Sequence, residues 1–300
     1  MRILVIGAQG QLGWELVRSC QVHGEVIAAT RAQVDLSRPD DAAASVVRYR
    51  PDVILNAAAY TAVDRAEDEE DAAHRVNAES VGAIAKAACG LNALLVHYST
   101  DYVFDGRKDA PYVESDVPMP LSAYGRSKLG GERALAASGA DYLCFRTSWV
   151  YASRGSNFLR TMLRLSTTHR KLRVVADNCG APTSARFIAD ATTVALRHAA
   201  SERHDGTFKS ELLHLTASGV TSSYGFADAI FRIRKSLCAD GFDAPILLPI
   251  LGTEYVTCAM RPANSQLACH HFSTRFGTPL PAWEEGVRLI LEELADVREF

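Results

Sequence analysis

A tyrosine and a lysine stand four residues apart in the segment YGRSK, as Tyr124 and Lys128. On a helix this spacing places both side chains on one face, one turn apart. A phenol beside an ammonium group can transfer a proton, but the pair could equally be an ordinary surface contact. With ten tyrosines and six lysines in 300 residues, about 0.2 such pairs are expected by chance. The spacing alone therefore does not identify a catalytic site, and the neighbouring residues must decide.

A glycine-rich segment, VIGAQGQLG, places Gly7, Gly10 and Gly13 between a first apolar run and a first helical pattern. Glycines at such a turn allow backbone N–H groups and a helix N-terminus to approach a pyrophosphate. The spacing differs from the G-x-G-x-x-G of many dehydrogenases, and a glycine turn can also serve only to pack a helix on a strand. Its position directly after a strand favours a dinucleotide site, which would include Gln11 and Leu12.

The end of the second predicted strand bears on which dinucleotide would bind. A carboxylate there bonds the ribose 2′-hydroxyl of NAD, whereas a nearby arginine accommodates the 2′-phosphate of NADP. This strand ends in AATR, with Arg31 and no carboxylate, which favours NADPH and leaves NADH open. Solvation alone is the alternative for Arg31. Asp35 could accept from the adenine amino group or cap the following helix, and Leu36 beside it is included in the predicted cofactor site.

The next two predicted strands end in small or polar residues. NAAAYT supplies Ala59, Tyr60 and Thr61, where small neighbours let the backbone pass close to a ligand. HYSTDYVF then supplies Thr100 and Asp101. The carboxyl end of a parallel strand is where open α/β sheets bind ligands. Capping of a turn is the alternative role for these polar groups.

These residues depend on a regular succession of elements for their placement. Near-continuous apolar strands separated by helices indicate a parallel sheet covered on both faces. Because crossover connections are right-handed, we predict an α/β fold built on an open, doubly wound parallel sheet. The predicted strands are Arg2–Ile6, Glu25–Ala29, Asp52–Ala57, Leu94–Ser99 and Tyr142–Thr147, and the predicted helices are Leu12–Cys20, Pro39–Tyr49, Asp71–Cys89 and Gly125–Ala137.

The second half of the chain has a looser rhythm. Its predicted elements are helices at Asn157–Ser166, Ala185–His198, Tyr224–Lys235 and Ala282–Leu294, and strands at Leu172–Ala176 and Leu212–Thr216. We therefore predict a dinucleotide-binding domain over residues 1–151. Residues 152–300 would form mainly a smaller C-terminal substrate-binding lobe, with some elements returning to the first domain.

The composition excludes several classes of function. A net charge of −3 and a pI near 6.3 provide no field that would draw the chain to nucleic acid or to an anionic membrane. No apolar run reaches the roughly 18 residues of a membrane span. The seven cysteines are scattered and none forms a C-x-x-C pair, so the spacing of zinc or redox motifs is absent. The N-terminus lacks a signal-peptide layout, and we expect a cytoplasmic soluble protein.

Several segments together carry a resemblance to a known family. The glycine turn, NAAAYTAVD, YSTDYVFDG, YGRSK and FRTSWVY resemble the extended short-chain dehydrogenase/reductases and, within them, the dTDP-4-dehydrorhamnose reductases. The similarity spans nearly the whole chain and includes GAPT at Gly180–Thr183 and RPANSQL at Arg261–Leu267. The tyrosine-lysine pair is common to the superfamily, whereas STDYVFDG combined with RTSWVY is far more specific. The resemblance implies a Rossmann-like fold.

The resemblance also implies catalytic roles. Tyr124 would be the general acid that donates a proton to a carbonyl oxygen as a hydride arrives. Lys128 would stabilise the developing phenolate and could hold the nicotinamide ribose, so both residues join the cofactor site. Thr100 would bond the substrate oxygen beside Tyr124, and Asp101 would adjoin the substrate.

Two further matched residues would contact the substrate. Trp149, at the end of the fifth strand, matches a substrate-contacting tryptophan, although indoles also bury well in a core. Arg261 is a candidate for the substrate diphosphate, because a guanidinium fork suits such an anion. A surface role is the alternative for Arg261.

Some members of the family form dimers bridged by magnesium through glutamates, which raises the question of a metal site. Glu15 matches one of these glutamates, and Glu293 is a candidate for another. Arg186 stands where the family pattern after GAPT has a glutamate, and a cation there would repel a metal ion. We expect no metal site, and a homodimer is left open.

The implied reaction is reduction of the C4 ketone of dTDP-4-dehydro-L-rhamnose to dTDP-L-rhamnose, with a hydride from NADPH and a proton from Tyr124. The implied partner is thus a dTDP-sugar. The alternatives are a sugar-nucleotide dehydratase or epimerase on the same fold, and a non-catalytic NADP-binding regulatory subunit. Dehydratases of the superfamily resemble one another in an Asp-Glu pair after the threonine, but here Tyr102 follows Asp101.

Overall fold

The computed structural model describes residues 1–237 and 241–296. Its centre is a parallel sheet of six strands in the order β2-β1-β3-β4-β5-β9. The strands are β1 (Arg2–Ile6), β2 (Glu25–Ala29), β3 (Val53–Asn56), β4 (Leu94–Thr100), β5 (Tyr142–Thr147) and β9 (Glu211–His214). The chain runs outward in one direction from β1 to β2 and in the other from β3 onward. The gap between the ends of β1 and β3 is therefore the topological switch point at which such sheets bind ligands.

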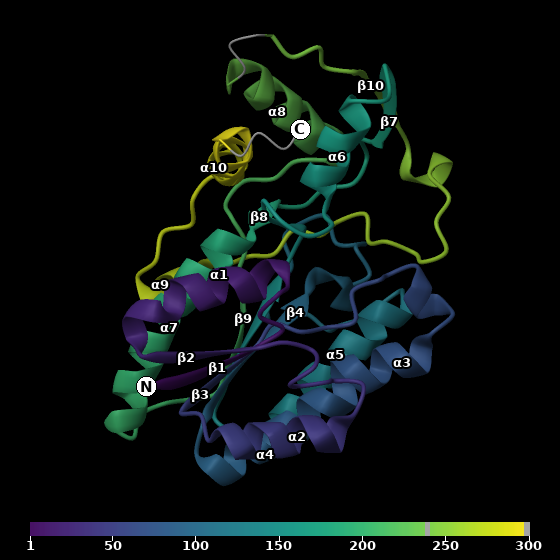
Figure 1. The fold of residues 1–300 in the computed structure, drawn as a ribbon. Coiled ribbons are helices and arrows are strands. Elements are labelled where there is room, and N and C mark those ends of the chain that lie inside the picture. The colour runs from purple at the N-terminus through teal and green to yellow at the C-terminus, as the bar shows by residue number, and fades with distance from the viewer. Residues whose placement is uncertain (238–240, 297–300) are drawn as a thin grey trace.

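Helices cover both faces of this sheet (Figure 1). One face carries α1 (Gln11–Cys20), α7 (Ala185–His204) and α9 (His270–Phe276), and the other carries α2 (Pro39–Tyr49), α4 (Ser80–Leu91) and α5 (Ala123–Ala136). Strand β1 shows why both faces need a cover. Its Ile3 and Val5 belong to the first core and its Leu4 and Ile6 to the second, as the two-residue period of a strand requires. The prediction of a doubly wound parallel sheet is confirmed.

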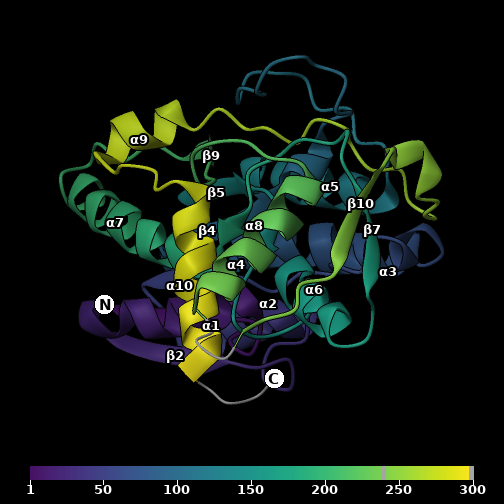
Figure 2. The same ribbon diagram turned by 90° about the horizontal axis from the view of Figure 1, so that it is seen from above.

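A second, smaller group of elements lies beyond the carboxyl ends of the strands (Figures 1 and 2). It comprises α6 (Phe158–Ser166), β7 (Lys171–Val175), α8 (Ser223–Leu237), β10 (Ile246–Ile250) and α10 (Trp283–Asp296). Its core contains Leu163, Phe226 and Leu291. A short parallel pair, β6 (Val150–Tyr151) with β8 (Thr183–Ser184), lies where the two groups meet.

The structure differs from the sequence prediction in several elements, among them the unpredicted two-residue strands β6 and β8. Strand β10 was not predicted, because Pro249 interrupts its pattern and most of its residues are exposed, as suits an edge strand. The seven-residue α9 was also not predicted, because a helix that short has little periodicity. The single helix predicted over Asp71–Cys89 is instead α3 (Glu70–His74), a π-helical turn (Arg75–Glu79) and α4. Within the described residues, no helix is both long and apolar enough to cross a membrane.

Candidate active site

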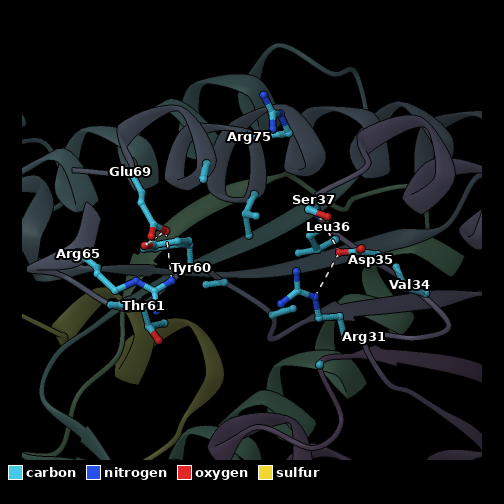
Figure 3. Close-up of a pocket in the computed structure, with 16 residues that line it drawn as sticks. Arg31, Val34, Asp35, Leu36, Ser37, Tyr60, Thr61, Arg65, Glu69 and Arg75 are labelled. Carbon is cyan, nitrogen blue, oxygen red and sulfur yellow. Dashed lines mark hydrogen bonds and ion pairs between the residues drawn. The ribbon is translucent and has the colours of Figure 1, made fainter. Parts of the chain in front are cut away.

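A pocket of about 420 Å³ lies at the switch point between β1 and β3. Figure 3 shows this pocket with Arg31 and Arg65 on its two sides. The structure gathers most of the predicted cofactor residues around it. They are Gly7, Arg31, Asp35, Leu36, Ala59, Tyr60 and Thr61. Gly10, Gln11, Leu12 and Gly13 belong to the turn and first helical residues behind Gly7 and do not line this pocket.

The glycine turn is closely packed against its neighbours. Gly7 has a φ of 81°, and a Cβ there would lie 2.9 Å from Ala58 at the end of β3. A Cβ on Gly13 would lie 2.1 Å from the carbonyl oxygen of Gly7. Both positions thus require glycine to bring α1 close to β1. The N-cap of α1 is Gly10, which has no side chain to cap the helix, so the N–H groups of the first turn can meet an anion.

Arg31 and Asp35 form one wall of the pocket. The Arg31 Nε lies 3.4 Å from the Asp35 Oδ1, and the Arg31 side chain is 82% exposed. Asp35 Oδ1 also accepts from the Ser37 N–H at 3.0 Å, and this bond, followed by lesser effects that include Arg31, lowers the pKa of Asp35. Asp35 does not cap the following helix, because the N-cap of α2 is Arg38 and has no side-chain cap.

Tyr60 on the opposite wall is held from two sides. Its hydroxyl donates to Glu69 Oε2 at 2.6 Å, and Arg65 Nη2 donates to the same oxygen at 3.1 Å. Asn77, in the π-helical turn, accepts from the Tyr60 N–H at 2.8 Å and donates to the Tyr60 carbonyl at 3.0 Å. Asn77 also donates to Ser127 Oγ at 2.9 Å, which ties the pocket wall to the residue before Lys128. Arg65, Glu69 and Asn77 were not among the predicted site residues.

Thr100 and Asp101 lie buried at the end of β4. Thr100 Oγ1 accepts from the Tyr102 N–H at 3.2 Å, so the capping role considered for it is present. Its hydroxyl donates to Asp101 Oδ1 at 3.0 Å. Burial raises the pKa of Asp101 to about 6, although hydrogen bonds to Ser265, Thr100 and other groups oppose the rise.

Tyr124 lies in the first turn of α5, beside residues of both pockets. Its ring meets the ring of Tyr102 edge to face at a centroid distance of 5.7 Å. It also packs, together with Tyr60, against a small alanine cluster that includes Ala123. Burial raises the pKa of Tyr124 well above its ordinary value, and a hydrogen bond to Thr100 opposes the rise. The phenol is therefore protonated at neutral pH and can serve as a proton donor.

Lys128 lies one turn further along α5 and is almost fully buried. Its Nζ donates to the carbonyl oxygen of Tyr98 at 2.6 Å and lies 3.4 Å from His97 Nε2. Burial lowers the pKa of Lys128 to about 8. An ammonium in such a place would favour a developing phenolate, because the low dielectric strengthens their attraction.

A buried ion pair lies one turn beyond Lys128. Arg146 on β5 contacts both carboxylate oxygens of Glu132, at 2.8 and 2.7 Å. Ser99 Oγ donates to Glu132 Oε1 at 2.5 Å. Both charged side chains are about 95% buried, so this ion pair holds α5 against the centre of the sheet away from the solvent-exposed surface. Glu132 and Arg146 were not predicted from the sequence to form this pair.

A second pocket of about 570 Å³ lies between the sheet and the smaller group of elements. Trp149 and Arg261 both line it, as do Tyr102, Arg173 and Tyr255. The two predicted substrate residues are thus brought together from positions far apart in the chain. Thr100 and Asp101 do not line this pocket. They neighbour its wall through Tyr102.

Trp149 has a constrained conformation in this pocket. Its φ is 47°, which is uncommon for a bulky residue and costs about 1–3 kcal/mol. The indole packs on Gly180 of the GAPT segment, where a Cβ would lie 2.7 Å from the ring. Trp149 also packs against the core of the smaller group, so the same side chain both contacts the core and lines the pocket.

Arg261 reaches the second pocket from the irregular segment near the C-terminus. Its Nη2 lies 2.8 Å from Asp64 Oδ2, and its side chain is 38% exposed. Arg173 on β7 supplies another guanidinium to the same pocket. The aromatic side chains and the two cations together suit a ligand that has a flat ring and a diphosphate.

The two glutamates considered for a metal bridge are joined by an arginine. Arg186 Nη2 lies 2.5 Å from Glu293 Oε2 and 3.4 Å from Glu15 Oε1. Glu15 is 2% exposed, and Arg18 contacts it as well at 2.7 Å. Two cations thus already neutralise the carboxylate that would have to receive a metal ion.

Comparison with known proteins places the chain in a family. A family model described as the RmlD substrate binding domain matches residues 1–296. A dTDP-4-dehydrorhamnose reductase of Burkholderia thailandensis is 50% identical over 298 residues, which cover 98% of this chain and 99% of that protein. The chain belongs to the dTDP-4-dehydrorhamnose reductase family. The predicted family membership, and the oxidoreductase class that it implies, are confirmed.

Two solved structures of dTDP-4-dehydrorhamnose reductases share the fold of this chain. The protein from Clostridium acetobutylicum is 34% identical, with a TM-score of 0.88, and the match covers 98% of this chain and all of that one (100%). The protein from Bacillus anthracis was solved in complex with NADP and is 31% identical, with a TM-score of 0.86 and coverage of 97% and 99%. The expectation of an NADP-type cofactor agrees with the latter complex.

Proposed function

We propose that this member of the dTDP-4-dehydrorhamnose reductase family reduces the C4 ketone of dTDP-4-dehydro-L-rhamnose to dTDP-L-rhamnose with NADPH. The observation that carries the proposal is the position of Tyr124. This half-buried tyrosine contacts Tyr102 of the second pocket and packs with Tyr60 of the first against one cluster. A proton donor between a dinucleotide pocket and a sugar-nucleotide pocket suits a reductase. In this proposal the N-terminal domain holds the cofactor and the C-terminal lobe holds the substrate.

Bound NADPH supplies the hydride that reduces C4. Tyr124 donates its hydroxyl proton to the carbonyl oxygen. Burial raises its pKa and so opposes this transfer, which a neighbouring cation must offset. Lys128, with a pKa of about 8, remains mostly an ammonium near pH 7 and stabilises the phenolate that forms. Thr100 can bond the substrate oxygen beside Tyr124 when its single hydroxyl hydrogen turns from Asp101 Oδ1, 3.0 Å away, to that oxygen.

The second pocket would take the nucleotide end of the substrate. Trp149 and Tyr255 offer aromatic faces to the thymine or the sugar. Arg261 and Arg173 offer guanidinium groups to the diphosphate, which would compete with Asp64 for Arg261. Because dTDP-sugars and NADPH are anions that do not cross a bilayer unaided, we also propose a cytoplasmic location.

The neighbourhood of Thr100 disfavours a dehydratase. Such an enzyme needs a base for the C5 proton, and the dehydratases of the superfamily resemble one another in a glutamate at the position where Tyr102 stands here. Burial raises the pKa of Tyr102 to about 12, so even less of this phenol is ionised at neutral pH than of an ordinary tyrosine, and it is not available as a base. Net reduction, which consumes the cofactor, is therefore favoured over internal recycling.

The stoichiometry of a single reaction tests the proposed function. We expect one NADPH to be oxidised for each dTDP-4-dehydro-L-rhamnose converted, because a reductase retains no hydride. Nicotinamide absorbance and chromatography of the sugar nucleotides measure both species. Conversion without matching NADPH loss would refute the assignment, and water elimination from dTDP-glucose with recycled cofactor would favour a dehydratase. Binding of NADPH with no turnover would favour the regulatory subunit.

Arg31→Ala is expected to weaken NADPH binding by roughly 10- to 150-fold, the range for loss of a charge-assisted hydrogen bond. Arg31 lines the first pocket and is paired only at 3.4 Å with Asp35, so its guanidinium is available to a 2′-phosphate. NADH lacks that phosphate, so its affinity should hardly change. Fluorescence titration with each cofactor measures the effect, and Arg48→Ala on α2 is a control outside the pocket. Equal losses for NADPH and NADH would exclude this role.

A further inference from the structure

A line of three buried polar side chains runs from β3 through β4 to Lys128. His97 Nε2 lies 3.4 Å from Lys128 Nζ, and His97 Nδ1 lies 3.3 Å from Asn56 Nδ2. Asn56 and His97 are each 1% exposed, and Lys128 is 2% exposed. His97 and Ser99 face α5 together, because alternate residues of a strand point to one side. The reaction proposed above assigns no role to His97 or Asn56.

The hydrogen-bond capacity of Lys128 shows what His97 can contribute. An ammonium has three N–H donors and no acceptor. One donor is directed to the Tyr98 carbonyl oxygen at 2.6 Å, and His97 Nε2 is in place to receive the second. The third is then left for the phenol of Tyr124 or for the cofactor. Two fixed acceptors would thus fix the direction of the remaining N–H bond.

His97 can accept this bond in only one protonation state. Its Nε2 must carry no hydrogen, so a neutral ring has its hydrogen on Nδ1, which faces Asn56. Asn56 must then present Oδ1 to the ring, which a half-turn of the amide achieves. With the amide nitrogen toward the ring, Oδ1 is buried and has no hydrogen-bond partner among the described residues. The turned amide therefore gives Oδ1 a partner and suits a charged Lys128.

We propose that His97, held as the Nδ1–H tautomer by Asn56, is a positioning residue that fixes the Lys128 ammonium and directs its free N–H bond toward the reaction centre. The role of Lys128 in this inference rests on the proposed function. The placement of the imidazole between Asn56 and Lys128 does not depend on it. His97 touches neither pocket and acts through Lys128 alone.

The other ionisable groups around this line do not replace His97. Burial and the charge of Lys128 both lower the pKa of His97 well below its ordinary value, so the ring is neutral. Around Lys128, Cys144 on β5 and Glu132 on α5 act to raise its pKa, but less strongly than burial lowers it. Glu132 is directed to Arg146 and Ser99, and burial raises the pKa of the Cys144 thiol, which keeps it uncharged.

The tautomer of His97 can be observed in the unaltered protein. Two-bond ¹H–¹⁵N spectra of histidine-labelled protein, assigned with a His97→Gln variant, distinguish the two neutral forms without substrate or cofactor. We expect His97 as the neutral Nδ1–H form at pH 7. An Nε2–H tautomer, or a charged ring, would overturn the inference, because neither could accept from the Lys128 ammonium.

Two substitutions then test the effect on Lys128. His97→Leu removes the acceptor, whereas His97→Gln keeps an oxygen that can take its place. In His97→Leu the pKa of Lys128, read from its ¹³Cε signal among the six lysines, should fall below that of the wild type. The basic limb of the kcat profile should move to lower pH by the same amount, and kcat at pH 8 should fall roughly 10- to 150-fold. His97→Gln should restore most of both.

The outcomes separate this inference from the proposed function. An unchanged Lys128 pKa in His97→Leu would refute the role of His97, whether or not the enzyme turns over. A wild type that fails to oxidise NADPH with the sugar nucleotide would refute the proposed function and leave the spectroscopic result intact. Thermal unfolding of both variants shows whether they fold. If His97→Leu does not fold, the tautomer of His97 in the wild type still tests the inference.

Discussion

Replacing Tyr124 by phenylalanine is expected to lower kcat by about 10²- to 10⁴-fold, the usual contribution of a positioned general acid. The substitution keeps the ring that packs on Tyr102 at 5.7 Å and on the alanine cluster, so the pocket walls should stay in place. The affinity for NADPH should therefore change little. Steady-state kinetics with dTDP-4-dehydro-L-rhamnose, together with a separate cofactor titration, measure the two quantities.

Tyr142→Phe provides a matched control for this loss. Tyr142 begins β5, at the end of the strands opposite the candidate site, so removal of its hydroxyl should leave kcat near that of the wild type. If Tyr124→Phe turned over at the wild-type rate, Tyr124 could not be the proton donor. A parallel loss of NADPH affinity would instead indicate that the hydroxyl serves the cofactor pocket.

Glu132→Gln is expected to lower the free energy of unfolding by about 3–5 kcal/mol, the cost of leaving one charge of a buried ion pair without its partner. The amide keeps the shape of the carboxylate but leaves the Arg146 guanidinium charged and about 96% buried. It also removes the negative charge from the group that accepts the hydrogen bond of Ser99 Oγ. Reversible urea unfolding followed by far-ultraviolet circular dichroism measures the change.

The matched control is an exposed ion pair of similar geometry. Arg170 and Asp243 approach to 2.8 Å, as Arg146 and Glu132 do to 2.7 Å, but their side chains are 91% and 84% exposed. Asp243→Asn should change the free energy of unfolding by about 1 kcal/mol or less. If Glu132→Gln and Asp243→Asn lowered the free energy of unfolding by similar amounts, burial would not determine how much the Glu132–Arg146 pair contributes to stability.

The central sheet could be predicted from the sequence because its strands have two buried faces. Runs such as ILVI in β1 and LLV in β4 are apolar at every position, which is typical of parallel strands covered by helices. Residues of the first pocket could be identified for a related reason. Glycines, Arg31 and the small residues after β3 all follow strand ends, and parallel strand ends meet at one edge.

The second pocket could not be predicted as a unit, because its lining comes from segments that only tertiary contacts bring together. Arg173 reads as the outward residue of a short amphipathic strand, and nothing local distinguishes it from a solvated arginine. The neighbouring strand β10 was not predicted because Pro249 interrupts its pattern. His97 did leave a signal, as a titratable residue within the buried run LLVHYST, but its contact with Lys128 depends on how α5 lies on β4.

Strand β9 has a consequence for how the polypeptide reaches its native state. It completes the central sheet beside β5, yet residues 148–210 separate the two strands in sequence. A ribosome must therefore synthesise more than two thirds of the chain before the sheet can close. Until then β5 is an open edge of the sheet. The apolar surface that α7 and α9 cover in the folded protein, which includes Phe145, is still exposed at that stage. The pairing of β5 with β9 thus couples the two halves in folding, and we expect the nascent N-terminal half to be the stage most exposed to aggregation.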